Sequence, residues 1–357
     1  MSPPDAPVPD GPPDASPCGN GTRDSNESCD GTDLGQETCI SQGFDGGDLV
    51  CNGNCTFDTT DCYMCTHPPV KKSCAGGWCT IEAGCFSMGS PSDESCRYPN
   101  EALHHVQLTH KFAMMESEMT QGSFGTVMGY APSFFSACGD SCPVEMVSWH
   151  EAISYCNILS AQNGLPLCYV NVGSGKTCTT SQDCPDPSTE VCVKNTCVNY
   201  TLAPSYDGKS QTIYDCLGIR LPTEAEWEYA YRAGTKGATY SGPIASCAGQ
   251  DSHADAIGWY KENSNGSTQP GNGKQPNQWG LFDMGGNVFE WVHDWYVVDL
   301  GGSVVKDPWG PAYAQFRVIR GGSWDSLARD TRAATRLDRL PTYRFAYAGF
   351  RCARSLP

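Results

Sequence analysis

The sequence predicts an α+β fold with little regular secondary structure, preceded by a small module that disulfides hold together. Three observations support this prediction. The 357-residue chain contains 39 glycines and 25 prolines, a content that favours loops over a helical bundle. Only two segments combine a helix-start signal with apolar residues at helical spacing. The 22 cysteines are even in number and clustered, which is typical of disulfides formed in an oxidising compartment.

The charge of the chain excludes several classes of function. Its 23 basic and 40 acidic residues give a net charge of −17, so the basic footprint of a nucleic-acid-binding protein is absent. An acidic chain is also repelled by anionic membrane surfaces. No apolar run approaches the length of a membrane span. We therefore expect neither a nucleic-acid partner nor a transmembrane segment.

Residues 1–17 are rich in proline and aspartate and are expected to form a disordered tether. They show neither the basic start nor the apolar stretch of a signal peptide. A tether of this kind ahead of an oxidised, folded module is typical of a bacterial lipoprotein beyond its anchor. We therefore expect an extracytoplasmic bacterial protein, either secreted or an outer-membrane lipoprotein.

Residues 18–62 form the first expected folded unit. The segment is too short to build a good hydrophobic core, so disulfides must stabilise it. The sequence does not choose among the possible pairings of its six cysteines. This unit resembles the cysteine-rich repeats of myxobacterial surface proteins, which implies a location more than an activity. A linker is expected over residues 63–79, and the main domain over residues 80–357. The six cysteines are Cys18, Cys29, Cys39, Cys51, Cys55 and Cys62.

The two expected helices of the main domain begin at capping boxes. Ser148 precedes Glu151 by three residues, and Thr223 precedes Glu226 by the same spacing. Apolar residues at helical spacing follow each box. Residues 102–112 instead alternate polar and apolar residues, which predicts a surface strand with His105 on its polar face rather than a histidine metal site.

Residues 178–197 read as a cysteine-rich insertion, stapled by its own disulfides and lying between Cys168 and Cys216. A bond between Cys168 and Cys216 would close this insertion at its base. A second bond, between Cys138 and Cys142, would form a tight local loop.

Six motifs in the main domain occur in an order that is specific in combination. They are GCFSMGS (84–90), PVEMVSW (143–149), RLPTEAEWEYA (220–230), GLFDMGGNVFEW (280–291), RGGSW (320–324) and GFRC (349–352). On these motifs the domain resembles the formylglycine-generating enzyme (sulfatase-modifying factor) family over about residues 80–354. The resemblance implies a C-type-lectin-related α+β fold and a disulfide between Cys156 and Cys352.

The fourth motif predicts one calcium site. Asp283 and Glu290 flank a glycine-rich turn in which backbone carbonyls can face inward, and calcium prefers such oxygen ligands. The resemblance implies that the Asp283 and Glu290 side chains bind the ion together with the carbonyls of Gly286 and Val288. The alternative is that the two acids only cap the turn.

The region between the fifth and sixth motifs argues against copper. Family members that oxidise a cysteine to formylglycine hold copper with two thiolates in this interval, because Cu(I) requires soft ligands. Residues 325–348 contain no cysteine, and the hydroxyl of Ser326 is no substitute for a thiolate. We therefore expect no bound copper and no conventional oxidase activity.

We interpret the chain as a sulfatase-modifying-factor-like protein that binds a ligand or peptide, or that is a divergent non-oxidase enzyme. The expected partner is a peptide, a protein or an anionic small molecule. Two alternatives remain: a formylglycine-generating oxidase that takes a thiolate from elsewhere, such as Cys247, and a purely structural envelope protein. The arginines near the C-terminus serve either a structural role or a ligand cleft. The cleft candidates are Ser323, Trp324, Arg329, Arg336 and Tyr347.

Overall fold

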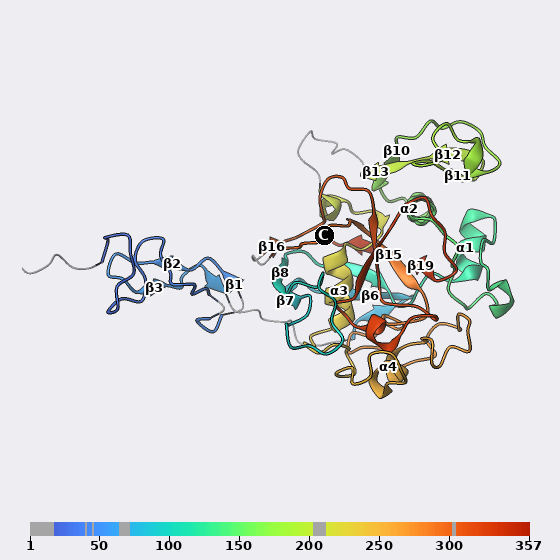
Figure 1. The fold of residues 1–357 in the computed structure, drawn as a ribbon. Helices are drawn as coiled ribbons and strands as arrows, with labels where there is room; N and C mark the ends of the chain where they lie inside the picture. The colour runs from blue at the N-terminus through green and yellow to red at the C-terminus, as the bar shows by residue number, and fades with distance from the viewer. Residues whose placement is uncertain (1–17, 40, 45, 64–71, 203–211, 302–304) are drawn as a thin grey trace, which may run out of the picture. The chain divides into compact units, whose positions relative to one another are not determined.

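The computed structural model describes residues 18–357 except 40, 45, 64–71, 203–211 and 302–304 (Figure 1). The tether expected over residues 1–17 lies outside the described residues. The chain divides into two compact units, Met1–Cys65 and Thr66–Pro357.

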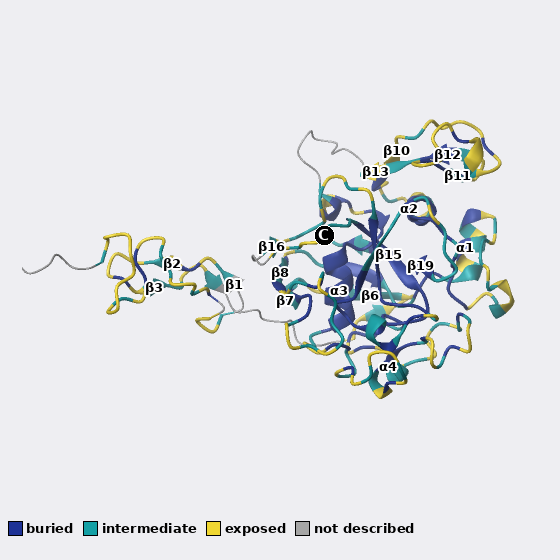
Figure 2. Ribbon diagram, in the orientation of Figure 1, coloured by how far each residue is buried: buried dark blue, intermediate teal, exposed yellow. Residues whose placement is uncertain are grey.

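The N-terminal unit is held by disulfides and polar turns rather than by an apolar core. Its cysteines pair as Cys18–Cys55, Cys29–Cys51 and Cys39–Cys62. The carboxylate of Asp30 accepts hydrogen bonds from three successive backbone amides, at 2.9–3.1 Å. Figure 2 shows most of this unit as exposed. Its short antiparallel pairs are β1 (Gly46–Gly47) with β4 (Cys62–Tyr63) and β2 (Val50–Cys51) with β3 (Phe57–Asp58).

Three sheets organise the larger unit. The four-stranded sheet has the order β18 (Arg336–Arg339), β17 (Arg317–Arg320), β15 (Phe289–Trp295), β19 (Ala348–Phe350). In it, β15 pairs with β17 antiparallel and with β19 parallel, so residues from the fourth, fifth and sixth motifs lie side by side. The five-stranded sheet has the order β14 (Ile219–Arg220), β20 (Ala353–Ser355), β9 (Phe112–Met115), β6 (Trp78–Ile81), β5 (Cys74–Ala75). The three-stranded sheet has the order β16 (Val305–Lys306), β8 (His104–Leu108), β7 (Gly84–Met88).

The larger unit begins earlier than residue 80. Strand β5 and the first two residues of β6 fall within the segment expected to be a linker, and the Cys74–Cys79 disulfide closes their hairpin. Pairing of β6 with β9 ties this hairpin to the main sheet. Of the expected linker, residues 64–71 lie outside the described residues. Strand β8 is present as predicted, with His105 and Gln107 on its less buried face.

Both expected helices form, with both capping boxes in place. These are α2 (Trp149–Gln162) after Ser148 and α3 (Glu224–Arg232) after Thr223. The expectation of only two helices is wrong, because α1 (Gln121–Met128) and α4 (Ser252–Ile257) form as well. The first contains two glycines and the second spans six residues, so neither carries a periodic apolar pattern. Single 3₁₀ turns cover Ser136–Cys138, Ser181–Asp183, Ile213–Asp215 and Ala328–Thr331.

Two short antiparallel pairs form at the cysteine-rich insertion, one at its C-terminal end and one between the segments that flank it. The bonds Cys178–Cys192 and Cys184–Cys197 staple it, and Cys168–Cys216 joins the segments that flank it. The bond Cys138–Cys142 is also present. The pairs are β10 (Tyr169–Asn171) with β13 (Tyr200–Leu202) and β11 (Val191–Val193) with β12 (Thr196–Val198).

Helix α3 is buried along its whole length, as Figure 2 shows, and yet carries three glutamates. Each glutamate has an arginine partner. Arg220 and Arg336 form bidentate pairs with Glu226 and Glu224, and Arg232 and Arg320 both bind Glu228. The guanidinium groups therefore neutralise carboxylates that burial alone would destabilise.

Candidate functional site

The turn after β17 carries the first candidate residues. Gly321 and Gly322 have φ values of +98° and +80°, which a side chain would strain. The turn brings two serines together: the hydroxyl oxygens of Ser323 and Ser326 lie 3.1 Å apart, and the Ser323 amide donates to Ser326 Oγ at 3.0 Å. Both serines are buried. Ser326 stands in the interval where the family resemblance implies copper thiolates, and Ser323 lies just before it.

The free thiols lie outside this turn. Among the described residues, the free cysteines are Cys156 on α2 and Cys352 beside β19, both buried. Their sulfurs lie 2.9 Å apart, so the structure brings the expected pair together but shows two thiols. Cys247 is bonded to Cys96. The proposal that Cys247 supplies a copper thiolate is therefore wrong, since its sulfur is already used.

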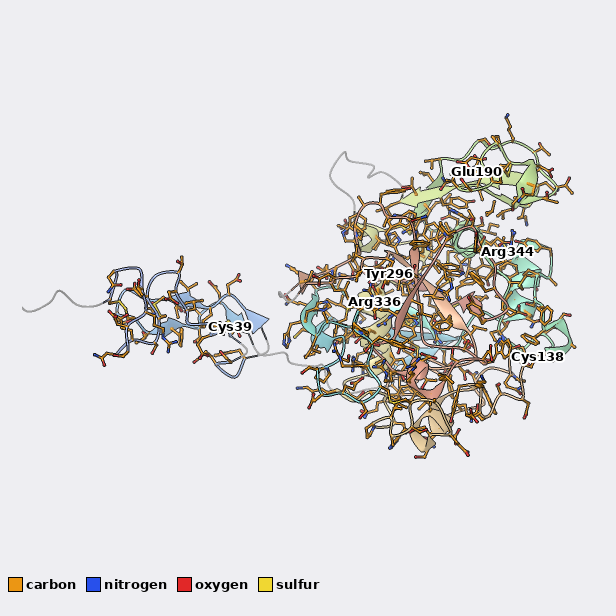
Figure 3. The ribbon with its side chains drawn as sticks, viewed as in Figure 1. Cys39, Cys138, Glu190, Tyr296, Arg336 and Arg344 are labelled. Atoms are coloured by element: carbon orange, nitrogen blue, oxygen red, sulfur yellow. A yellow bond between two sulfur atoms is a disulfide. The ribbon has the colours of Figure 1, made fainter. Side chains whose placement is uncertain are left out.

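Of the two arginines expected to line a ligand cleft, the structure contradicts the role of Arg336. Arg336 is buried, its guanidinium forms two 2.7 Å hydrogen bonds with Glu224, and its carbon lies 4.7 Å from the ring centre of Tyr296 (Figure 3). Arg329 lies over the ring of Tyr98, at 4.8 Å. Arg336 is therefore a structural residue and no ligand contact, because its charge is already paired inside the protein.

Trp324 and Tyr347 instead belong to a group of partly exposed aromatic residues. The ring of Trp324 packs edge-to-face on Phe135 at 5.0 Å, and Phe135 packs in the same way on Phe134. Tyr347 stacks on Phe345 at 4.8 Å, with Tyr343 beside Phe345. We call this set the aromatic platform; it consists of Phe134, Phe135, Trp324, Tyr343, Phe345 and Tyr347.

Hydrogen bonds to backbone groups join the two halves of the platform, one around Trp324 and Phe135 and the other around Phe345 and Tyr347. The indole N–H of Trp324 donates to the carbonyl of Ala346 at 2.9 Å. The amide of Met146 donates to the carbonyl of Phe345, and the neighbouring Glu145 accepts the amides of Phe134 and Phe135 at 3.0 and 2.8 Å. Burial raises the pKa of Glu145, and these two amides partly offset that rise. These hydrogen bonds therefore fix the positions of the platform segments relative to one another.

The platform offers apolar surface to solvent. Phe134 is 70% exposed and Tyr343 is 53% exposed, although both are large apolar rings. Arg339 lies at the edge, where its Nε donates to the Tyr347 hydroxyl at 3.0 Å and its charge faces the ring of Phe345. Clustered exposed rings with one polar edge are typical of protein interaction sites.

The predicted calcium ligands lie around a buried group of three acids. Arg351 forms a bidentate pair with Glu290, at 2.7 Å for both bonds, and Trp227 Nε1 donates to the same carboxylate. Asp283 accepts the amide of Asn272 with Oδ2, but its buried Oδ1 has no hydrogen-bond partner. Burial raises the pKa of Asp283 to about 6.

The third acid is Glu118, which the sequence reading missed. It accepts the side-chain amide of Asn287 at 2.7 Å and the backbone amide of Val288 at 3.0 Å. Burial, together with the charges of Asp283 and Glu290, raises its pKa well above the ordinary value. The donor set fits a hard cation, because Asp283 Oδ1 is a buried oxygen without a donor.

Residues Phe134, Phe135 and Glu145 were also missed. Glu145 lies in the PVEMVSW motif, which was noted for its order rather than for its carboxylate. The rings of Phe134 and Phe135 come from an irregular segment before the Ser136–Cys138 turn. Adjacent phenylalanines in a stretch without periodicity were the available signal.

Two features bear on location. Most of the described cysteines are in disulfides, which form in oxidising compartments. In the described part of the chain, no helix has the length and apolar character that crossing a bilayer requires.

Curated proteins of several kinds match parts of the chain. A chaperone protein LppX of Paenibacillus barcinonensis is 30% identical over 234 residues, which cover 60% of this chain and 70% of that protein. A formylglycine-generating enzyme of Streptomyces coelicolor is 38% identical over 150 residues, 38% of this chain and 46% of the enzyme. The serine/threonine-protein kinase pkn1 of Chlamydia pneumoniae is 37% identical over 143 residues, 39% of this chain and 22% of the kinase. The chain thus spans less than half the length of this enzyme and of the kinase.

Solved structures agree with the fold. Treponema denticola variable protein 1 superposes with a TM-score of 0.63 at 29% identity, covering 81% of this chain and all of that one. PvdO from Pseudomonas aeruginosa, at 24% identity, covers 78% of this chain and 94% of its own with a TM-score of 0.57, and shows the fold alone. Residues 66–356 match the sulfatase-modifying factor enzyme 1-like domain. The chain therefore belongs to the family of proteins that carry this domain.

Proposed function

We propose that the chain is a binding protein on a sulfatase-modifying-factor scaffold, and that its aromatic platform recognises exposed polypeptide segments. One observation carries the proposal: six aromatic rings gather beside the Ser323–Ser326 hydroxyl pair, with Phe134 and Tyr343 largely exposed. Aromatic rings provide much of the affinity of peptide and protein interfaces at little entropic cost. The relative named as a chaperone protein also supports a polypeptide ligand.

The platform favours peptides that combine an aromatic or aliphatic side chain with an acidic one. Stacked rings accept apolar side chains, while the guanidinium of Arg339 lies at the edge within 5.7 Å of the Tyr347 ring centre. Its Nη1 donates to the carbonyl of Asp338, and its Nε to the hydroxyl of Tyr347. These are neutral partners, so the cation keeps its charge available for an anionic group.

A calcium ion belongs to the same proposal as a structural cofactor. Asp283 Oδ1 would hold it together with the carbonyl oxygens of Gly286 and Val288, three of the four ligands that the family resemblance implies. The fourth, Glu290, already binds Arg351 and Trp227. The ion would supply positive charge to a buried acidic group that Arg351 neutralises only at Glu290. The proposed location is extracytoplasmic, either secreted or as an outer-membrane lipoprotein of a bacterium, where the cysteine-rich N-terminal unit meets other surface components.

Peptide selection tests the proposed platform. A phage-displayed random dodecapeptide library is panned against the wild-type protein and against the double variant Phe134→Ser/Tyr343→Ser. We expect enriched sequences with the wild type and their loss with the double variant, while thermal unfolding of the two proteins coincides. The matched control is Tyr313→Ser, since Tyr313 is 78% exposed and lies outside the platform. Equal enrichment by all three proteins would contradict the proposal.

The oxidase alternative has its own test on the same sample. Cu(I) is titrated into the protein, free thiols are quantified after unfolding, and a cysteine-containing peptide is assayed for aldehyde. We expect two free thiols, those of Cys156 and Cys352, with no stoichiometric tight copper binding and no aldehyde. The two thiols are buried, and the hydroxyls of Ser323 and Ser326 are hard ligands. Tight copper with aldehyde formation would overturn the non-oxidase function.

A further inference from the structure

A second feature of the larger unit lies outside the aromatic platform and the calcium group. It is a cavity of about 440 Å³, bordered by strands β8 and β16, the first residues of α3 and the chain that follows β15. A cavity of this size accommodates a small organic molecule. Its lining includes Asp294, Trp295, Val297, Leu300 and Trp309.

Asp294 is the unusual member of this lining. The residue is only 4% exposed, and its Oδ2 accepts the backbone amide of Glu224 at 2.7 Å. Its other oxygen, Oδ1, has no hydrogen bond or ion pair with any described residue. Burial, reinforced by the charge of Glu224, raises the pKa of Asp294 well above its ordinary value. The ionised carboxylate is costly in such a place without a cationic partner, and a cation bound beside it would lower this pKa and restore the charge.

Unlike Asp294, the neighbouring buried acids have arginine partners. Glu224, Glu226 and Glu228 on α3 each bind one or two arginines. The charge of Arg317 acts on Asp294, but its guanidinium is held between the rings of Trp149 and Trp295, at 3.8 and 3.5 Å, and donates to the carbonyl of His293. No ion pair reaches Asp294 from the described residues, which leaves a cation to be supplied from outside the chain.

We propose that this cavity binds an organic ammonium ion with an apolar body. The ammonium group donates to Asp294 Oδ1, and the body packs against Trp295, Leu300 and Trp309. A buried carboxylate with aromatic walls is a general solution for such ligands, because the rings attract the cation and cover its hydrocarbon part.

The chemistry of the walls excludes the other ligand classes. A hard metal ion needs several oxygen ligands, but Glu224 is paired with Arg336, and Asp307 is bonded to Thr109 and His110. Of the carboxylates in the lining, this leaves Asp294 and Asp299. An anion would meet Asp294, Asp299 and Asp307 and only the single lysine, Lys306. The adjoining surface is apolar too: Tyr313 is 78% exposed with its ring 5.3 Å from that of Trp295. These features suit a ligand that is both cationic and apolar.

Binding of three matched probes to the full chain tests the ligand class. Isothermal titration calorimetry at pH 7.5 compares 2-phenylethylammonium, 2-phenylethanol and 3-phenylpropionate, which share an aromatic body and differ in charge. We expect saturable binding of the ammonium, with at least tenfold weaker binding of the alcohol and of the carboxylate. Equal affinity for the ammonium and the alcohol, or no saturable binding of the ammonium, would overturn the proposal.

Two variants locate the site. Asp294→Asn retains an oxygen to accept the Glu224 amide but removes the charge, so ammonium binding should weaken at least tenfold while phenylethanol binding is unchanged. The matched control, Glu262→Gln, removes an exposed carboxylate elsewhere and should leave all three affinities unchanged. Val297→Trp fills the cavity with Asp294 intact and should abolish binding of the ammonium. Thermal unfolding checks each fold; should Asp294→Asn not fold, the filling variant and the three probes still decide. Undiminished ammonium binding by either folded variant would place the site elsewhere.

Discussion

Individual charges in this molecule separate into paired and unpaired acids, and the distinction decides which acids are available to ligands. Glu101, for instance, is buried but binds Arg332 through two hydrogen bonds of 2.8 and 2.6 Å. Such acids are neutralised within the fold and contribute specificity more than stability. Asp283 and Asp294 lack an arginine partner among the described residues. An inorganic cation is proposed at the first and an organic one at the second.

Calcium should stabilise the protein through Asp283. A ligand that binds only the folded state adds about 2.7 kcal/mol when its concentration is 100 times its dissociation constant. We therefore expect the melting temperature to rise when CaCl₂ is added after chelation with EDTA, and Asp283→Asn to remove most of that rise. Differential scanning calorimetry with and without the ion measures both effects.

The control for this experiment is magnesium at the same concentration. Magnesium demands a tighter octahedral shell and dehydrates reluctantly, so its effect should be smaller than that of calcium. A melting temperature indifferent to both chelator and calcium would show that Asp283 and Glu290 only cap the turn.

At the level of single elements, the start of helix α2 supports the platform as well as the helix. The hydroxyl of Ser148 accepts a hydrogen bond from the Glu151 amide, and the Glu151 carboxylate accepts one from the Ser148 amide at 2.8 Å. The same carboxylate accepts a 2.7 Å bond from Arg344 and another from Tyr130. Since Arg344 precedes Phe345 in the chain, the helix cap fixes one end of the platform segment.

Removing this cap should therefore have a measurable cost. Ser148→Ala deletes the hydroxyl that accepts the Glu151 amide, and loss of an N-cap typically costs about 0.5–2 kcal/mol. We expect the free energy of unfolding to fall by about that amount in urea titrations with the disulfides intact. Thr126→Ala, on the exposed face of α1, is the matched control and should change stability by less than about 0.5 kcal/mol. Equal effects of the two changes would show that the cap is not limiting.

For the molecule as a whole, the family, the sparse secondary structure and helices α2 and α3 could be predicted from the sequence. Their signals are local: a capping box fixes where a helix starts, and the six motifs keep their order regardless of what joins them. Strand β8 was predictable for the same reason, because alternation from His104 to Leu108 is a local pattern.

The site was less predictable because it depends on contacts distant in sequence. Arg336 was a plausible ligand residue until its pairing with Glu224, which is 112 positions earlier, was known. The aromatic platform draws rings from residues 134–135, 324 and 343–347, which no spacing rule connects. Helix α1 was missed because its glycines hide a helix that the packing of Phe124 and Met128 stabilises.

The contribution of one buried histidine, His150, to the stability of the whole larger unit should fall in mild acid, whereas the raised pKa values of Glu118, Asp283 and Asp294 act in the opposite direction. His150 accepts the Tyr200 amide with Nδ1, while its buried Nε2 has no partner; burial, with the charge of Arg317, lowers its pKa to about 3. The unfolded chain takes up this proton near pH 6.5 and the folded chain does not, so the unfolded state binds more protons below pH 6.5 and stability falls with pH. Between pH 6.5 and 5, this residue should lower the free energy of unfolding by about 2 kcal/mol.

His150→Asn keeps an acceptor for the Tyr200 amide without a titrating group. In urea titrations across this range, the variant should therefore lose about 2 kcal/mol less of its free energy of unfolding than the wild type. The control is His253→Asn, which removes a half-buried histidine elsewhere and leaves Tyr200 and its strand pairing unaltered. Identical pH profiles for wild type and His150→Asn would mean that His150 protonates without unfolding the protein.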